Sequence, residues 1–146
     1  MRTLLLRIVF ALYLVAVGFI VWSPQPDAGA FTGVVAIAAR WLEALGLPFE
    51  PTYIVLEFLA NIALFVPFGI LALTAFRWMR VWSATAAGFF TSCLIEGVQL
   101  FLPTRFSTIS DLVANTAGAL IGALLVAGWR RRQGRRELSA AASRPS

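Results

Sequence analysis

The sequence predicts an all-α membrane protein, a four-transmembrane-helix bundle with a short interfacial helix in the outer loop between the first and second spans. Of its 146 residues, 60% are hydrophobic and only 13% are charged, about half the charged fraction of an average soluble domain. Four apolar runs approach or exceed the roughly 20 residues that a membrane-spanning helix needs. Arginines gather at alternate ends of these runs. Together, these observations predict one membrane domain.

The apolar runs divide the chain into four parts. They cover about residues 4–22, 58–76, 81–102 and 112–129. Tryptophans stand at the ends of the runs, where amphipathic rings sit in the headgroup layer. The predicted parts are a first transmembrane helix at 1–22, an outer loop with the interfacial helix at 23–56, a membrane core of three transmembrane helices at 57–129, and a disordered basic cytoplasmic tail at 130–146.

The arginines predict the orientation. All 12 basic residues are Arg, and only Arg40 and Arg105 fall in the two loops on the other side. The positive-inside rule therefore predicts a multi-pass protein of the inner or plasma membrane with both termini in the cytoplasm. This asymmetry accounts for the net charge of +5, so we expect no nucleic-acid partner. A cleaved signal peptide ending near Ala28, Gly29 and Ala30 is the alternative interpretation of the first span.

Apolar residues between Phe31 and Leu45 recur at helical spacing, which predicts a short helix ended by Gly46 and Pro48. This helix lies either on the outer membrane surface or packed over the bundle. The chain has no His and a single Cys. We therefore expect no disulfide, no metal site and no cofactor.

Polar residues inside the spans predict a site. Residues three or four apart share a helix face, and three spans each carry one polar edge near the outer side. These residues are Glu57 and Asn61, then Ser92, Glu96 and Gln99, then Asp111 and Asn115. A rise of about 1.5 Å per residue places Asn61, Glu96 and Asn115 in one layer, with Arg105 in the loop just above.

Each of these residues also has a structural interpretation. Asn61 and Asn115 can join helices by hydrogen bonds, Asp111 can cap a helix, and Glu57 can lie at headgroup level. Glu96 can be ionised and paired with Arg105, or protonated because burial disfavours the charged form. Gly118 and Gly122, four residues apart, favour close helix packing.

These residues resemble the VanZ-like family of bacterial membrane proteins over about residues 57–122. The resemblance rests on NIALFVPFG from Asn61, on Glu96 with Gln99, on Arg105, and on DLVANTAGALIG from Asp111. It implies a small membrane protein of the bacterial cell envelope with about this topology. The namesake of the family is associated with resistance to glycopeptide antibiotics, notably teicoplanin.

Four functions remain open from the sequence. In the first, Arg105 binds the phosphate of an anionic lipid or cell-wall precursor in the outer leaflet, above Asn61, Glu96, Gln99, Asp111 and Asn115. In the second, Glu96 or Asp111 is the catalytic acid or base of a membrane enzyme that modifies such a lipid. A transporter would need polar groups at further depths. A helper subunit would only pack against a larger partner.

Overall fold

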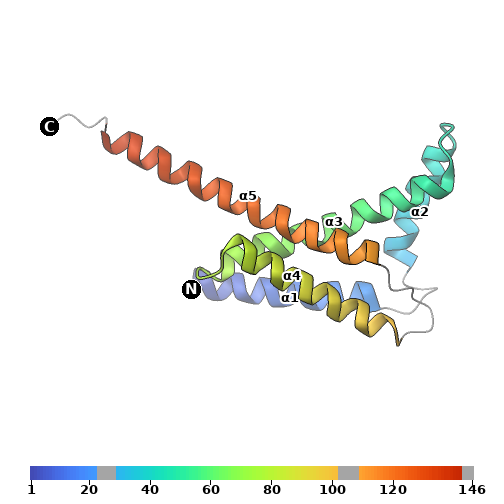
Figure 1. Ribbon diagram of the computed structural model, residues 1–146, viewed down its shortest axis with the longest axis horizontal. Coiled ribbons are helices and arrows are strands. Elements are labelled where there is room, and N and C mark those ends of the chain that lie inside the picture. Colours follow the sequence, from blue (N-terminus) through green and yellow to red (C-terminus); the bar gives the residue numbers. More distant parts are fainter. Residues whose placement is uncertain (23–28, 102–108, 143–146) are drawn as a thin grey trace.

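The computed structural model describes residues 1–22, 29–101 and 109–142, and those residues form five helices and no strand (Figure 1). The helices are α1 (Arg2–Trp22), α2 (Gly29–Glu43), α3 (Phe49–Ala75), α4 (Val81–Gln99) and α5 (Ile109–Ala142). The all-α prediction is confirmed.

Four of the helices, α1, α3, α4 and α5, are long and apolar enough to cross a membrane. With 15 residues, α2 is only about 22 Å long, which is short of the roughly 30 Å hydrocarbon core. The outside of the bundle is apolar: Leu12, Phe19 and Phe90 are exposed by 63%, 77% and 68%. A surface of this kind suits contact with lipid tails and not with water, which confirms a four-span membrane bundle.

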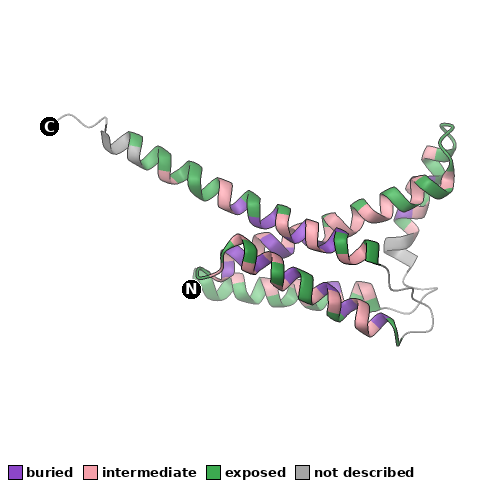
Figure 2. Ribbon diagram, in the orientation of Figure 1, coloured by how far each residue is buried: buried purple, intermediate pink, exposed green. Residues whose placement is uncertain are grey.

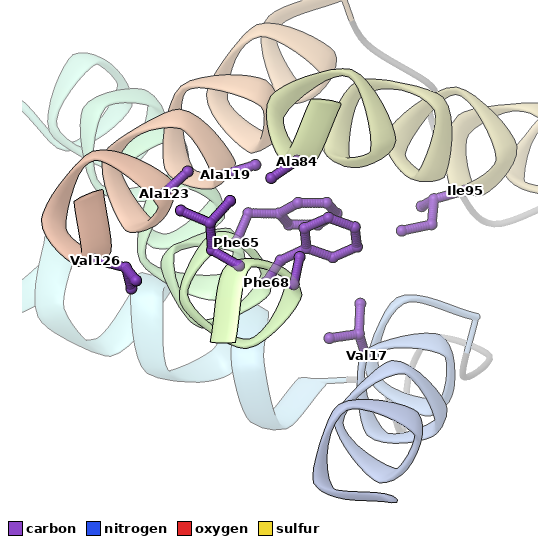
Figure 3. Packing of buried hydrophobic residues seen from close by; sticks show 10 residues of the cluster. Val17, Phe65, Phe68, Ala84, Ile95, Ala119, Ala123 and Val126 are labelled. Atoms are coloured by element: carbon purple, nitrogen blue, oxygen red, sulfur yellow. The ribbon is translucent and has the colours of Figure 1, made fainter. Parts of the chain in front are cut away.

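Two aromatic rings lie in the middle of the core. Phe65 and Phe68 of α3 stack with their ring centroids 5.7 Å apart. Small residues of α5 and α4 surround the rings, and Val17 reaches the same cluster from α1 (Figure 3). Because Ala119 and Ala123 are small, they leave room for the large rings between the helices.

The closest packing joins α3 and α5. A Cβ atom on Gly69, Gly118 or Gly122 would lie less than 3.0 Å from a backbone oxygen of the facing helix. Gly118 faces Ile62 and Gly122 faces Val66, so residue numbers rise together and the two helices run in the same direction. The predicted role of Gly118 and Gly122 in close helix packing is confirmed.

The predicted helix after the first span is α2, and it ends as expected. Gly46 adopts φ +95°, while the amide groups of Gly46 and Leu47 donate to the carbonyl oxygens of Glu43 and Leu42. This Schellman arrangement satisfies the last carbonyls of a helix. α2 packs on α3 with Val35 and Ala39 buried, as in the second alternative above, and its predicted position on the membrane surface stays a prediction.

Two boundaries differ from the sequence prediction. The second span was expected from about residue 58, but α3 already begins at Phe49. Pro51 is compatible with this start because the amide groups of the first helical turn have no partner in the helix, and Glu50 favours the positive end of the helix. The predicted outer loop is shorter by these residues.

The second difference concerns residues 130–146, which were predicted to be disordered. α5 continues to Ala142 instead, and residues 131–133 and 135–137 are exposed along it (Figure 2). Arg, Gln, Glu, Leu and Ala all favour helix, so the high charge of this segment indicates a solvated helix and not disorder. Residues 143–146 lie outside the described part of the chain.

The bundle has two different ends. We call the end that carries the first residues of α1, the α3–α4 turn and Arg130 the basic end, and the opposite end the loop end (Figure 1). The polar residues of interest lie toward the loop end of α3, α4 and α5.

Candidate functional site

The pair nearest the loop end is Asn61 and Asp111. The Asn61 side-chain amide donates a hydrogen bond of 2.6 Å to a carboxylate oxygen of Asp111. Asn61 lies on α3, and Asp111 lies in the first turn of α5. Because that turn is the positive end of the helix, it stabilises an ionised carboxylate. The amide fixes the direction of the carboxylate, and both residues are only half-buried.

A second pair lies one turn further along α5. The side-chain amide of Asn115 donates a hydrogen bond of 2.9 Å to the hydroxyl oxygen of Ser92 on α4. Ser92 is fully buried, and Asn115 is only 4% exposed. Burial of an amide and a hydroxyl costs free energy unless they are hydrogen-bonded, so the bond between Asn115 and Ser92 offsets part of that cost.

Half of the Asn115 amide is left without a partner. Its Oδ1 atom is buried and makes no hydrogen bond. The Ser92 hydroxyl can donate or accept, but one hydroxyl satisfies only one end of an amide that offers two donors and an acceptor. An unsatisfied buried acceptor costs about 1–3 kcal/mol, so this atom calls for a donor that the described residues do not supply.

Two predicted residues lie beyond Ser92 on α4. Glu96 follows one turn later and is half-buried. Gln99 is 7% exposed, and its side-chain amide donates a hydrogen bond of 3.2 Å to the carbonyl oxygen of Val21. Val21 belongs to the last turn of α1, whose carbonyls have no partner within the helix. Gln99 therefore also connects α4 to the end of α1.

The remaining predicted residues lie at the margin. Glu57 is half-buried on α3 and accepts a hydrogen bond of 3.4 Å from the Tyr53 hydroxyl. Arg105 lies outside the described residues. In the described part of the chain, no three His, Cys, Asp or Glu side chains come together as metal ligands would.

The hydrogen bonds join the polar residues in pairs that the predicted layer did not specify. Asn61 pairs with Asp111 and not with Asn115, whose partner is Ser92. The result is two hydrogen-bonded pairs, one above the other, that share α5. The side chains offer carboxylate, amide and hydroxyl oxygens, which can accept hydrogen bonds from the hydroxyl and amide groups of a ligand.

One polar contact was missed in the sequence. The Tyr13 hydroxyl of α1 donates a hydrogen bond of 2.6 Å to the carbonyl oxygen of Leu64 on α3. Pro67 has no amide hydrogen and so gives no helical hydrogen bond to the carbonyl oxygen of Ala63, the residue next to Leu64. A tyrosine inside an apolar span, opposite a proline in another span, is the signal that was available.

A family model described as VanZ/LLP1 matches residues 10–130. Searches among curated proteins and among solved structures give no significant match.

Proposed function

The chain belongs to the VanZ/LLP1 family, and on that premise we propose that it is a multi-pass protein of the bacterial plasma membrane that binds an anionic lipid or a cell-wall precursor at the loop end. In this proposal both termini are cytoplasmic, so the loop end lies in the outer leaflet. The ligand contacts Asn61, Glu96, Gln99, Asp111 and Asn115, and Arg105 binds its phosphate.

The observation that carries the proposal is the unpaired Oδ1 atom of Asn115. Membrane proteins rarely bury polar groups without a partner, and those that do so often use them for function. A hydroxyl or amide group of a wall precursor, or the hydroxyl of a lipid headgroup, supplies the missing donor. The Asn61–Asp111 pair above it offers further acceptors on the path from the loop end.

The charges of the site fit a ligand that carries both an anionic phosphate and neutral hydrogen-bond donors. Glu96 and Asp111 can accept hydrogen bonds from neutral donor groups of the ligand, and they would repel an unscreened phosphate. The phosphate therefore belongs with Arg105, whose guanidinium matches two phosphate oxygens at once. A headgroup with a phosphate at one end and hydroxyl or amide donors at the other satisfies both requirements.

Native mass spectrometry of the purified protein tests the proposal. The wild type should carry a phosphorylated or wall-precursor lipid, which should be lost from Glu96→Gln and from the double variant Ser92→Ala, Asn115→Leu. Thr116→Val is the matched control, because the Thr116 hydroxyl donates within α5 to Leu112. The same lipid on the wild type and all variants, or none on any, would refute a binding role for this layer.

One observation favours an enzyme as the second candidate. The short hydrogen bond from Asn61 holds the Asp111 carboxylate in a fixed direction, as a general acid or base requires. Incubation with the bound lipid would then change its mass, and Asp111→Asn, which keeps a hydrogen-bond acceptor, would retain the lipid without converting it. A lipid of unchanged mass in both proteins leaves the binding function.

The family resemblance extends the proposal to antibiotics. A protein that holds a wall precursor in the outer leaflet would compete with a glycopeptide for that precursor. Its expression should therefore shift susceptibility to teicoplanin. The inhibitory concentration for cells with the wild type is compared with that for cells with the double variant at positions 92 and 115. Equal values in the two strains would remove the antibiotic from the proposal and leave lipid binding to be decided by mass spectrometry.

A further inference from the structure

A cavity lies at the end of the bundle opposite to these polar pairs. It has a volume of about 470 Å³ and opens at the basic end, between α1, α3 and α5 and the turn after α3. The described residues that line it are Arg2, Thr3, Leu6, Thr74, Arg77, Trp129, Arg130 and Gln133. It is separate from the polar layer and shares no residue with it.

The lining is strongly basic. Arg2, Arg77 and Arg130 come from three different segments of the chain, and none of the described lining residues is acidic. Within the described residues, the guanidinium groups of Arg2 and Arg77 have no hydrogen-bond or ion-pair partner, while Arg130 uses one nitrogen for the carbonyl oxygen of Leu73. Like charges that converge without acids repel each other, so the cavity is suited to an anion.

An apolar groove on α5 lies beside the cavity and shares Trp129 with it. Ile121, Leu124, Leu125 and Gly128 line a second hollow of about 360 Å³, which Arg132 borders at its basic end. Trp129 lines both hollows and so lies between them. From Ile121 to Gly128 the groove follows α5 for about 10 Å, away from the arginines and into the apolar part of the helix.

We propose that these two hollows together bind one anionic phospholipid, with its phosphate group among Arg2, Arg77 and Arg130 and one acyl chain in the groove. Arginine binds phosphate oxygens through two parallel N–H groups. A free phosphate ion would use the cavity but not the groove, whereas a lipid needs both. Trp129 lies where the headgroup meets the chain, the position that tryptophan favours in membranes.

This site goes beyond the proposed function and lies in the opposite leaflet. In the proposed orientation the basic end faces the cytoplasm, and the cytoplasmic leaflet is where anionic lipids give the membrane its negative surface potential. Basic pockets between transmembrane helices on that side are suited to phosphate headgroups. The lipid would hold α1 and the α3–α4 turn against α5.

Native mass spectrometry of the full chain in detergent, titrated with phosphatidylglycerol or with phosphatidylcholine of the same acyl chains, tests the site. The wild type should bind phosphatidylglycerol at least about fivefold more tightly, because one arginine near a membrane surface contributes about 1 kcal/mol, which is about fivefold. Arg77→Gln and Arg2→Gln should each lose most of this preference. Arg131→Gln is the matched control, since Arg131 is exposed next to Arg130 and lines neither hollow.

A variant that fills the groove tests whether the groove holds an acyl chain. A Cβ added at Gly128 would meet no other atom within 4 Å, so Gly128→Leu can fill the groove without disturbing the bundle. It should weaken the binding of phosphatidylglycerol with long chains and leave the binding of a short-chain form unchanged. Gly134→Leu is the control, because Gly134 also has open space on α5 but lies outside both hollows.

The outcomes separate the lipid from other occupants. Equal affinity for the two lipids, or equal loss in Arg77→Gln and Arg131→Gln, would overturn the proposal. Displacement of the lipid by inorganic phosphate, together with no effect of Gly128→Leu, would assign the cavity to a free anion instead. A dimer that dissociates in Gly128→Leu would assign the groove to a second copy of the chain. Thermal unfolding of each variant in the same detergent identifies any loss of binding that comes from misfolding.

Discussion

The guanidinium of Arg130 on α5 donates a hydrogen bond of 2.6 Å to the carbonyl oxygen of Leu73 on α3. Leu73 is in the last turn of α3, where carbonyl groups have no partner in the helix. The carbonyl of Ala72, one residue earlier, accepts a hydrogen bond from the amide of Phe76. Arg130 supplies the donor for the carbonyl of Leu73. A positive charge at this negative helix end is also favourable.

Replacement of Arg130 should therefore weaken the bundle. Arg130→Gln is expected to cost about 1 kcal/mol of unfolding free energy, which is modest because Arg130 is exposed. Arg131→Gln removes the same charge without a bond and should stay within about 0.5 kcal/mol of the wild type. Thermal unfolding in a zwitterionic detergent without added lipid checks this, and equal stability of the two variants would contradict it.

The glycines between α3 and α5 should tolerate no side chain. Gly122→Ala brings a Cβ against the carbonyl oxygen of Val66, and overpacking of this kind costs about 1–3 kcal/mol. Gly128→Ala, on the same helix with open space around it, should instead gain up to about 1 kcal/mol from helix propensity. Unfolding midpoints in detergent measure both. A Gly122→Ala protein as stable as Gly128→Ala would mean that the two helices can separate freely.

The hydroxyl of Tyr13 should stabilise the contact between α1 and α3. Tyr13→Phe keeps the ring and removes only the bond to Leu64, so we expect a loss of about 1 kcal/mol, as for other hydrogen bonds between membrane helices. Thr85→Val is a suitable control, because the Thr85 hydroxyl bonds within its own helix. No difference between the two variants would show that the Leu64 carbonyl needs no second donor.

The buried pair of Ser92 and Asn115 should respond to mutation in a non-additive way. Ser92→Ala leaves the Asn115 amide with no partner and should cost about 1–3 kcal/mol. The double variant Ser92→Ala, Asn115→Leu removes both polar groups, and should be close to the wild type or more stable. Comparison of the two single variants with the double variant measures the coupling. A double variant that is the least stable of all would mean that the pair specifies the fold.

The sequence predicted most of the bundle but less of the site. Four apolar runs predicted the spans, because an apolar segment in lipid must satisfy its backbone hydrogen bonds internally and therefore forms a helix. The partners of Asn61 and Asn115 were not predicted, because depth along a helix does not tell how far one helix is shifted against another. α3 begins at Phe49, earlier than expected, and its fixed contact with Gly118 and Gly122 brings Asn61 to Asp111.

The basic cavity escaped prediction for a related reason. The positive-inside rule gives the side of the membrane on which Arg2, Arg77 and Arg130 lie, but not the direction in which each points around its helix. The packing of α1 and α5 against α3 brings them to one place. The helical continuation of α5 was missed because its high charge was interpreted as a sign of disorder.

That continuation divides α5 into two parts that respond to different conditions. Residues 109–129 are about 31 Å long and match the hydrocarbon core, so ionic strength should hardly affect them. Beyond them, Arg131, Arg132, Arg135 and Arg136 fall on one side of the helix, where their attraction to lipid phosphates is screened over about 10 Å in 0.1 M salt. A higher salt concentration of the surrounding solution should therefore weaken the contact of these arginines with lipid phosphates and leave the packing of residues 109–129 unchanged.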